Sequence, residues 1–160
     1  MEIAMLKAPA LDPALIEAKV GSGYPAPFNV STAGRAKKML TSALGLAQFG
    51  VNITELDPDS ATSLRHWHSH EDEFVYVLDG EVTLVTGSGS QVLTKGMCAG
   101  FAAGVEDGHC IENRSARPAT ILEVGSRDDR DEGNYPDVDL HCKANRYKHV
   151  QFTRKDGTPY

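Results

Sequence analysis

Short apolar runs that alternate with polar positions fill the middle of the chain, and Gly, Asp, Pro and Ser separate them. Successive side chains of a strand point to opposite faces of its sheet, so this period of two predicts strands, and their spacing is typical of a sandwich or barrel. We therefore predict an all-β fold. The predicted strands span residues 48–56, 63–68, 73–78, 81–86, 91–94, 110–113 and 119–124.

Two turns are predicted between these runs. Asp79-Gly80 is a favourable pair for a two-residue hairpin turn, and it lies between the predicted strands 73–78 and 81–86. The segment 87–90, Gly-Ser-Gly-Ser, predicts a looser turn into the next strand.

The two ends of the chain differ from this middle part. Residues 1–45 are rich in Ala, Pro and Gly and predict an N-terminal extension with one short amphipathic helix at 13–20. The basic stretch 34–44 is too short and isolated for a helix-turn-helix reader, and we expect a solvated or strand-bound arm. Residues 126–160 lose the alternation and gain charge and proline, which predicts a tail that packs on the barrel or on a partner subunit. The expected single domain therefore has its core at 46–125.

Composition excludes several classes of function. The 160 residues carry 16 basic and 22 acidic side chains, and this net charge of −6 repels a phosphate backbone, so we expect no nucleic-acid partner. No apolar run approaches the roughly 20 residues that cross a bilayer, so we expect no membrane partner and a cytoplasmic protein. The widely spaced Cys98, Cys110 and Cys142 form no CxxC pair and are expected to be free thiols.

The densest chemical signal is a segment of eight residues with three imidazoles and three carboxylates, His66-Trp67-His68-Ser69-His70-Glu71-Asp72-Glu73. On a strand His66 and His68 share a face about 6.6 Å apart, close enough to converge on one ion. Imidazole binds several transition metals, and a carboxylate adds charge that favours harder divalent ions. Glu73 can supply it if residues 69–72 form a turn or bulge that restarts the alternation.

This spacing resembles the first motif of the cupin family, in which HxH is followed after three or four residues by Glu and after six more by Gly. The matching residues here are His66, His68, Glu73 and Gly80. A second stretch resembles the looser second cupin motif, with Gly96, Ala102-Ala103-Gly104, His109 and Asn113. It departs from that motif because Ala102 stands where the family usually has proline, and because the gap from Gly to His is two residues longer.

The resemblance covers about residues 45–125 and implies a single jelly-roll cupin barrel of two antiparallel sheets. It also implies one divalent transition metal ion, such as Zn, Mn, Fe or Ni, held by His66, His68, Glu73 and His109. Such an ion keeps open positions at which a substrate oxygen or O₂ can bind.

The same resemblance implies an enzyme that acts on a small polar molecule, and among its activities we favour a sugar or sugar-phosphate isomerase or epimerase. A non-haem metal dioxygenase and a non-catalytic metal-dependent binding module remain the alternatives. Tyr76, Glu123 and His70 are the candidates for proton transfer. His70 could also replace His66 as a ligand, although the family spacing disfavours this. Jelly-roll edges and apolar tail residues predict a homodimer.

Two further expectations concern neighbours of the predicted ligands. Trp67 falls opposite the two histidines by parity, so we expect it to pack away from the substrate. Glu71 and Asp72 are expected to be solvated loop charges, with a hydrogen bond to a ligating histidine as the alternative.

Overall fold

A six-stranded antiparallel sheet dominates the structure, which is a computed structural model and is described here for residues 6–160. The first five residues of the expected N-terminal extension lie outside the described part. The elements in chain order are η1 (Pro13–Leu15), β1 (Lys19–Val20), η2 (Val30–Thr32), β2 (Arg35–Met39), α1 (Leu40–Ala43), β3 (Phe49–Leu56), β4 (Trp67–His68), β5 (Glu73–Asp79), β6 (Glu81–Thr86), β7 (Gly89–Thr94), β8 (Cys98–Phe101), β9 (Cys110–Glu112), β10 (Ala119–Ser126), β11 (Gly133–Asn134), β12 (His141–Cys142) and β13 (Phe152–Thr153).

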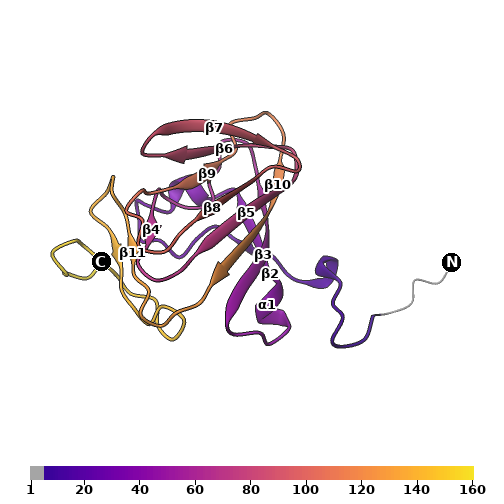
Figure 1. Cartoon of the computed structure of the whole chain (residues 1–160), viewed down its shortest axis with the longest axis horizontal. Helices are drawn as coiled ribbons and strands as arrows, with labels where there is room; N and C mark the ends of the chain where they lie inside the picture. Colours follow the sequence, from indigo (N-terminus) through magenta and orange to yellow (C-terminus); the bar gives the residue numbers. More distant parts are fainter. Residues whose placement is uncertain (1–5) are drawn as a thin grey trace.

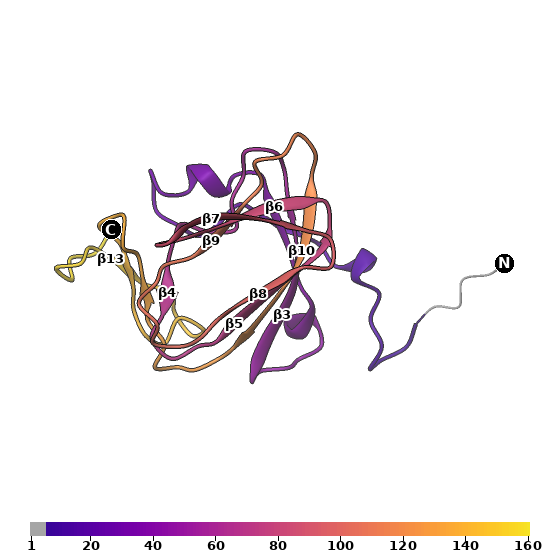
Figure 2. The same ribbon diagram turned by 45° about the horizontal axis from the view of Figure 1, so that its top comes forward.

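The strands form three antiparallel sheets (Figure 1). The six-stranded sheet has the order β1-β2-β3-β10-β5-β8, and a three-stranded sheet has the order β7-β6-β9. Viewed along the barrel, these two sheets lie on opposite sides of the interior (Figure 2). A small sheet of order β13-β12-β11-β4 lies at one end. The predicted all-β fold is therefore confirmed.

The main core lies between the two facing sheets. Val75, Val77 and Ile121 come from the six-stranded sheet and pack against Val82 and Ile111 of the three-stranded sheet. The alternation predicted for β5 is correct, because Val75 and Val77 are buried while the intervening side chains are exposed. Burial of such side chains contributes roughly 1.5–3 kcal/mol each, which makes this layer the main source of stability.

The expected hairpin at Asp79-Gly80 is wrong. β5 pairs with β10 and β8, whereas the next strand, β6, pairs with β7 and β9, so the chain passes from one sheet to the other at this point. Gly80 has φ +79°, and a Cβ there would lie 3.0 Å from Ala119 Cα. The Asp-Gly pair therefore makes a sharp corner between sheets. The true hairpin follows, with Thr86 opposite Gly89, so it is tighter than the predicted turn 87–90.

Several predicted elements have other bounds. The helix expected at 13–20 is wrong: the short η1 forms at its start and β1 at its end, and Leu15 is 83% exposed, so no apolar helix face packs on the barrel. The strand expected at 63–68 is reduced to β4 and one isolated bridge. The basic stretch 34–44 contributes β2, which pairs along β3. The edge strand β8 was not predicted, because Cys98–Phe101 lacks β-branched residues.

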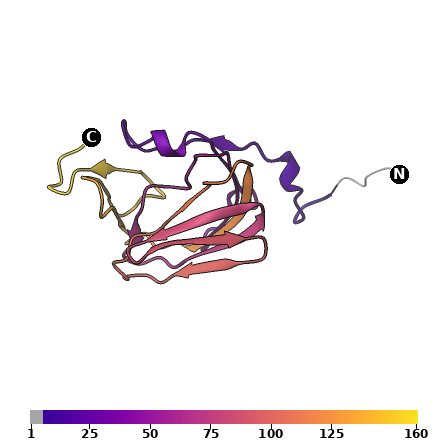
Figure 3. The ribbon, with the colours of Figure 1, turned by 90° about the horizontal axis from the view of Figure 1, so that it is seen from above.

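The C-terminal segment folds back onto the end of the barrel that carries β4, where part of the N-terminal arm also lies (Figure 3). Its strand β11 pairs with β4, and a second apolar cluster forms around Tyr135, Leu140 and Cys142. Tyr24 and Phe28 of the N-terminal arm pack against this cluster. Within residues 6–160, no helix has the length and apolar character needed to cross a membrane.

Candidate metal centre

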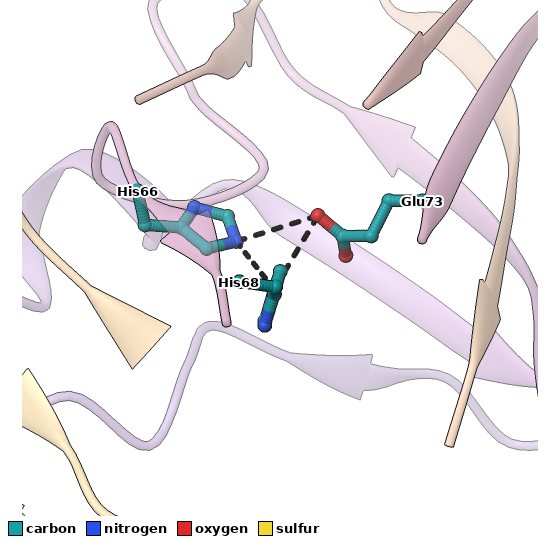
Figure 4. A group of neighbouring side chains, drawn as sticks. All are labelled: His66, His68 and Glu73. Carbon is teal, nitrogen blue, oxygen red and sulfur yellow. Dashed lines mark hydrogen bonds and ion pairs between the residues drawn. The ribbon is translucent and has the colours of Figure 1, made fainter. Parts of the chain in front are cut away.

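Three of the predicted ligands lie next to one another although they come from different segments (Figure 4). His68 lies on β4 and Glu73 begins β5. His66 and His109 exchange backbone hydrogen bonds of 3.0 and 2.9 Å, which brings His109 to the same place from a distant part of the chain. All three histidines approach one carboxylate oxygen: Glu73 Oε2 lies 3.6 Å from His66 Nε2, 3.4 Å from His68 Nε2 and 2.9 Å from His109 Nε2.

The spacing of these atoms fits a metal ion. The Nε2 atoms of His66 and His68 are 3.1 Å apart. A point equidistant from these two atoms and Glu73 Oε2 lies about 2.0 Å from each, which is the circumradius of a triangle with sides of 3.1, 3.4 and 3.6 Å. Zn²⁺ binds imidazole nitrogen and carboxylate oxygen at roughly 2.0–2.2 Å. His66, His68 and Glu73 could therefore hold a divalent transition metal ion without rearrangement. His109 Nε2 contacts Glu73 Oε2, but it does not lie within 4.8 Å of all three of these ligand atoms.

The hydrogen bonds on the far side of two imidazoles leave their Nε2 atoms available as ligands. His66 Nδ1 lies 2.9 Å from the carbonyl oxygen of Leu64, which can only accept, so Nδ1 carries the proton. His68 Nδ1 lies 2.6 Å from a carboxylate oxygen of Asp131. Two Nε2 lone pairs that face each other at 3.1 Å repel unless a cation, a metal ion or a proton, lies between them. This arrangement also favours a metal centre.

The electrostatics of the cluster follow from burial and from these contacts. Burial by itself lowers the pKa of His68, but hydrogen bonds with Asp131 and Glu73 outweigh it and raise that pKa to about 9. Burial raises the pKa of Glu73, whereas hydrogen bonds from three histidines hold it well below its usual range. Burial lowers the pKa of His109 despite the nearby carboxylate. The cluster thus keeps a negative carboxylate among imidazoles, the charge distribution that suits a cation.

A cavity of about 580 Å³ opens beside the cluster, and His68, Glu73 and His109 form part of its wall. Phe101 stacks on His109 with the ring centroids 3.5 Å apart, which fixes the plane of that imidazole. Trp67 also lines the cavity, so the expectation that it packs away from the substrate is wrong. β4 is only two residues long, and side chains at its ends are not restricted to one face.

The three residues that the sequence suggested for proton transfer lie outside this cavity. Tyr76 is on the outer face of its sheet and is 37% exposed. Glu123 forms an ion pair of 2.8 Å with Lys37 and accepts a hydrogen bond of 2.6 Å from Thr54. His70 is exposed and hydrogen-bonds Ser69 Oγ. None of Tyr76, Glu123 and His70 lines the cavity. The sequence could not place them, because their positions depend on strand register and on a loop.

The charged groups behind His68 differ from what the sequence predicted. Glu71 is 2% exposed, so the expectation of a solvated charge is wrong, while Asp72 is exposed as expected. Glu71, His68 and Asp131 form a second group with ligand atoms close together. The guanidinium of Arg146 contacts both carboxylates, however, so a cation already belongs to this group. Asp131 and Arg146 lie in the irregular tail, where alternation gives no signal of burial.

Three imidazoles and one carboxylate that could hold a metal ion, inside a jelly-roll barrel, are typical of proteins of the cupin class. Comparisons with known proteins agree with this class. Residues 52–125 match the family described as Cupin domain. The chain is 43% identical to a sugar phosphate isomerase of the cupin superfamily from Silicibacter pomeroyi, with a TM-score of 0.89 and coverage of 95% of this chain and 96% of that one. The chain therefore belongs to the cupin superfamily.

Other solved structures share the fold at lower identity. A proposed sugar phosphate isomerase from Acidithiobacillus ferrooxidans is 26% identical, with a TM-score of 0.70 over 79% of this chain and 80% of that one. The polyketide cyclase RemF from Streptomyces resistomycificus is 19% identical, with a TM-score of 0.62 over 78% of this chain and 81% of that one, and shows the fold alone. A comparison with curated protein sequences finds no significant match.

Proposed function

We propose that this cupin is a metal-dependent isomerase or epimerase that acts on a small sugar or a similar hydroxy-carbonyl compound. The observation that carries the proposal is the convergence of His66, His68 and His109 on one oxygen of Glu73, at the wall of a cavity of about 580 Å³. The relationship to the protein from Silicibacter pomeroyi, described as a sugar phosphate isomerase, supports the same reaction class.

The residues of the cluster would hold one divalent ion, which supplies Lewis-acid polarisation of a carbonyl or hydroxyl oxygen when it is bound. Residues of the chain orient the candidate ligands and line the cavity beside them. His66 and His68 direct Nε2 toward the common point because their Nδ1 atoms hydrogen-bond Leu64 O and the Asp131 carboxylate. The aromatic walls formed by Trp67 and Phe101 exclude water from one side of a bound substrate.

The lining of the cavity favours an uncharged substrate. Thr86, Ser88 and Gln91 contribute hydroxyl and amide groups that can hydrogen-bond the hydroxyls of a sugar. Among the residues described, no lysine or arginine lines this cavity, whereas phosphate groups are usually held by basic side chains or helix N-termini. We therefore place the unphosphorylated sugar ahead of its phosphate ester as substrate.

Asp107 is the residue that we assign to proton transfer. It lines the cavity and is exposed, and its Oδ1 accepts a hydrogen bond of 2.7 Å from the backbone N–H of Gly87. That hydrogen bond fixes the carboxylate at the wall. The other carboxylates of the lining are already engaged, Glu73 with the histidines and Glu71 with Arg146. A carboxylate within reach of a substrate C–H is what enolisation requires.

The proposal is tested by incubating protein loaded with Mn²⁺, Zn²⁺, Ni²⁺ or Fe²⁺ with aldoses and ketoses of three to six carbons under argon and following their interconversion by NMR. Conversion that requires the ion and fails in His68→Ala supports an isomerase. Turnover that appears only in air, with consumption of O₂, would instead identify the dioxygenase. Binding of the sugars without turnover in either atmosphere would identify a binding module.

A further inference from the structure

A buried network of charges connects the C-terminal segment to His68. Asp131 is 0% exposed and Glu71 is 2% exposed, and the Arg146 guanidinium contacts both carboxylates. The hydroxyl of Tyr147 donates to Glu71, with both oxygens at 2.8 Å. Backbone N–H groups complete the network, from Asp128 to Glu71 at 2.8 Å and from His70 to Asp131 at 2.9 Å.

Burying two carboxylates side by side is costly unless a cation and hydrogen bonds compensate them. Arg146 is the cation in contact with both, and it comes from a segment about 75 residues away from Glu71 in sequence. The network reaches the candidate ligand His68, because one oxygen of Asp131 lies 2.6 Å from His68 Nδ1. The other oxygen is used by the backbone of His70, so the carboxylate cannot rotate without losing a bond.

We propose that Asp131 is a positioning residue for the metal centre and that Arg146, by its ion pairs with Asp131 and Glu71, makes the C-terminal segment part of that centre. Asp131 holds the Nδ1 proton of His68 and directs Nε2 toward Glu73. A carboxylate behind a ligating histidine orients the ring and increases its basicity as a ligand. This inference rests on the proposed metal centre and deepens it. His66 has a neutral carbonyl in the equivalent position, so the two histidines differ in how firmly they are held.

The test measures the Zn²⁺ dissociation constant by competition with a chromophoric chelator in full-length wild type and in Asp131→Asn. Asparagine has nearly the same shape and keeps one acceptor oxygen, so the fold should persist, and circular dichroism verifies this. Loss of a carboxylate behind a ligating histidine typically weakens metal affinity by about 10–100-fold, and we expect that loss here. The absorption spectrum of the Co²⁺-loaded variant should also change, because the ring orientation of one ligand changes.

Glu123→Gln is the matched control. Glu123 is also a mostly buried carboxylate paired with a basic residue, Lys37, but its partners are Lys37 and Thr54, whereas Asp131 contacts the candidate ligand His68. We expect a lower melting temperature and an unaltered Zn²⁺ affinity and Co²⁺ spectrum. Arg146→Met should weaken Zn²⁺ binding as Asp131→Asn does. If it leaves the affinity intact, the coupling to the C-terminal segment is wrong.

The inference is overturned if Asp131→Asn keeps the wild-type affinity and spectrum, or if Glu123→Gln loses as much affinity. Either result would show that the network stabilises the fold only. A wild-type protein that takes up no divalent ion would contradict the metal centre itself and this inference with it. The two failures are therefore distinguished by the wild-type measurement.

Discussion

His109 Nε2 lies 2.9 Å from Glu73 Oε2, although the two residues are 36 positions apart. Glu73 is the first residue of β5 in the six-stranded sheet, and His109 directly precedes β9 of the three-stranded sheet. The contact exists because the starts of these two strands lie close together. His109 was also the candidate ligand that the sequence supported least, since the second cupin motif is stretched around it. The structure brings it to Glu73, whereas the group of ligand atoms within 4.8 Å of one another contains His66, His68 and Glu73.

Removing two imidazoles should empty the metal centre. We expect the purified wild-type protein to carry about one divalent transition ion per chain and the double variant His68→Ala, His109→Ala to carry none, because a single remaining imidazole and a carboxylate bind weakly. Elemental analysis of both proteins measures this directly. An unchanged ion content in the double variant would place the ion elsewhere.

Replacing Asp107 should reduce turnover without removing the ion. Loss of a proton-transferring group typically lowers the rate by about 10²–10⁴-fold, so we expect kcat of Asp107→Asn to fall in that range while its metal content stays at the wild-type level. The matched control is Asp79→Asn, since Asp79 is an exposed carboxylate that pairs with Lys95 at 3.4 Å and does not line the cavity. Equal losses in both variants would contradict the role assigned to Asp107.

Phosphorylated substrates should be used less well than neutral ones. The cavity wall carries the carboxylates of Glu73 and Asp107, and its described lining has no lysine or arginine that could pair with a phosphate dianion. We expect a higher kcat/KM for a sugar than for its phosphate ester, in parallel assays of one aldose and its terminal phosphate. A preference for the ester would show that basic groups outside this lining, or from a partner chain, hold the phosphate.

The three cysteines should differ in reactivity, since they are free thiols and only Cys98 is exposed. Burial raises the pKa of Cys110 to about 12 and also raises the pKa of Cys142, so both are thiols and not thiolates near pH 8. We expect a chromogenic disulfide reagent to modify one thiol in the folded protein and three after denaturation. Rapid reaction of all three thiols in the folded protein would contradict the buried positions.

We propose that the protein is a homodimer that pairs through the outer face of the six-stranded sheet. Phe74 and Tyr76 are 40% and 37% exposed on the outer face of β5 beside the edge strand β8, and apolar exposure of this kind is typical of an interface. Light scattering at micromolar concentration should give twice the chain mass. Phe74→Glu should then give the mass of one chain, whereas the control Leu15→Glu, an exposed residue of the N-terminal arm, should not. A monomeric wild type would reject the dimer.

Local sequence patterns were enough to predict the all-β class, most strands of the barrel and three candidate ligands on consecutive segments. Those features depend on local properties: the alternation of side chains along a strand, and the short spacing that links His66, His68 and Glu73. The buried face of β5 was also predictable, because a period of two puts Val75 and Val77 on the same face as the candidate ligand Glu73.

The tertiary structure decided which strands pair and which distant charges meet. Asp79-Gly80 is compatible with a hairpin or with a corner between sheets, and the close approach of Ala119 selects the corner. Asp131 and Arg146 lie in a charged tail that predicts exposure, yet they form an ion pair behind His68 in which Asp131 is fully buried and Arg146 is half-buried. Their burial is favourable only as a network, since each charge alone would remain in water. No local pattern encodes such mutual compensation, so the support of the metal centre could be found only in three dimensions.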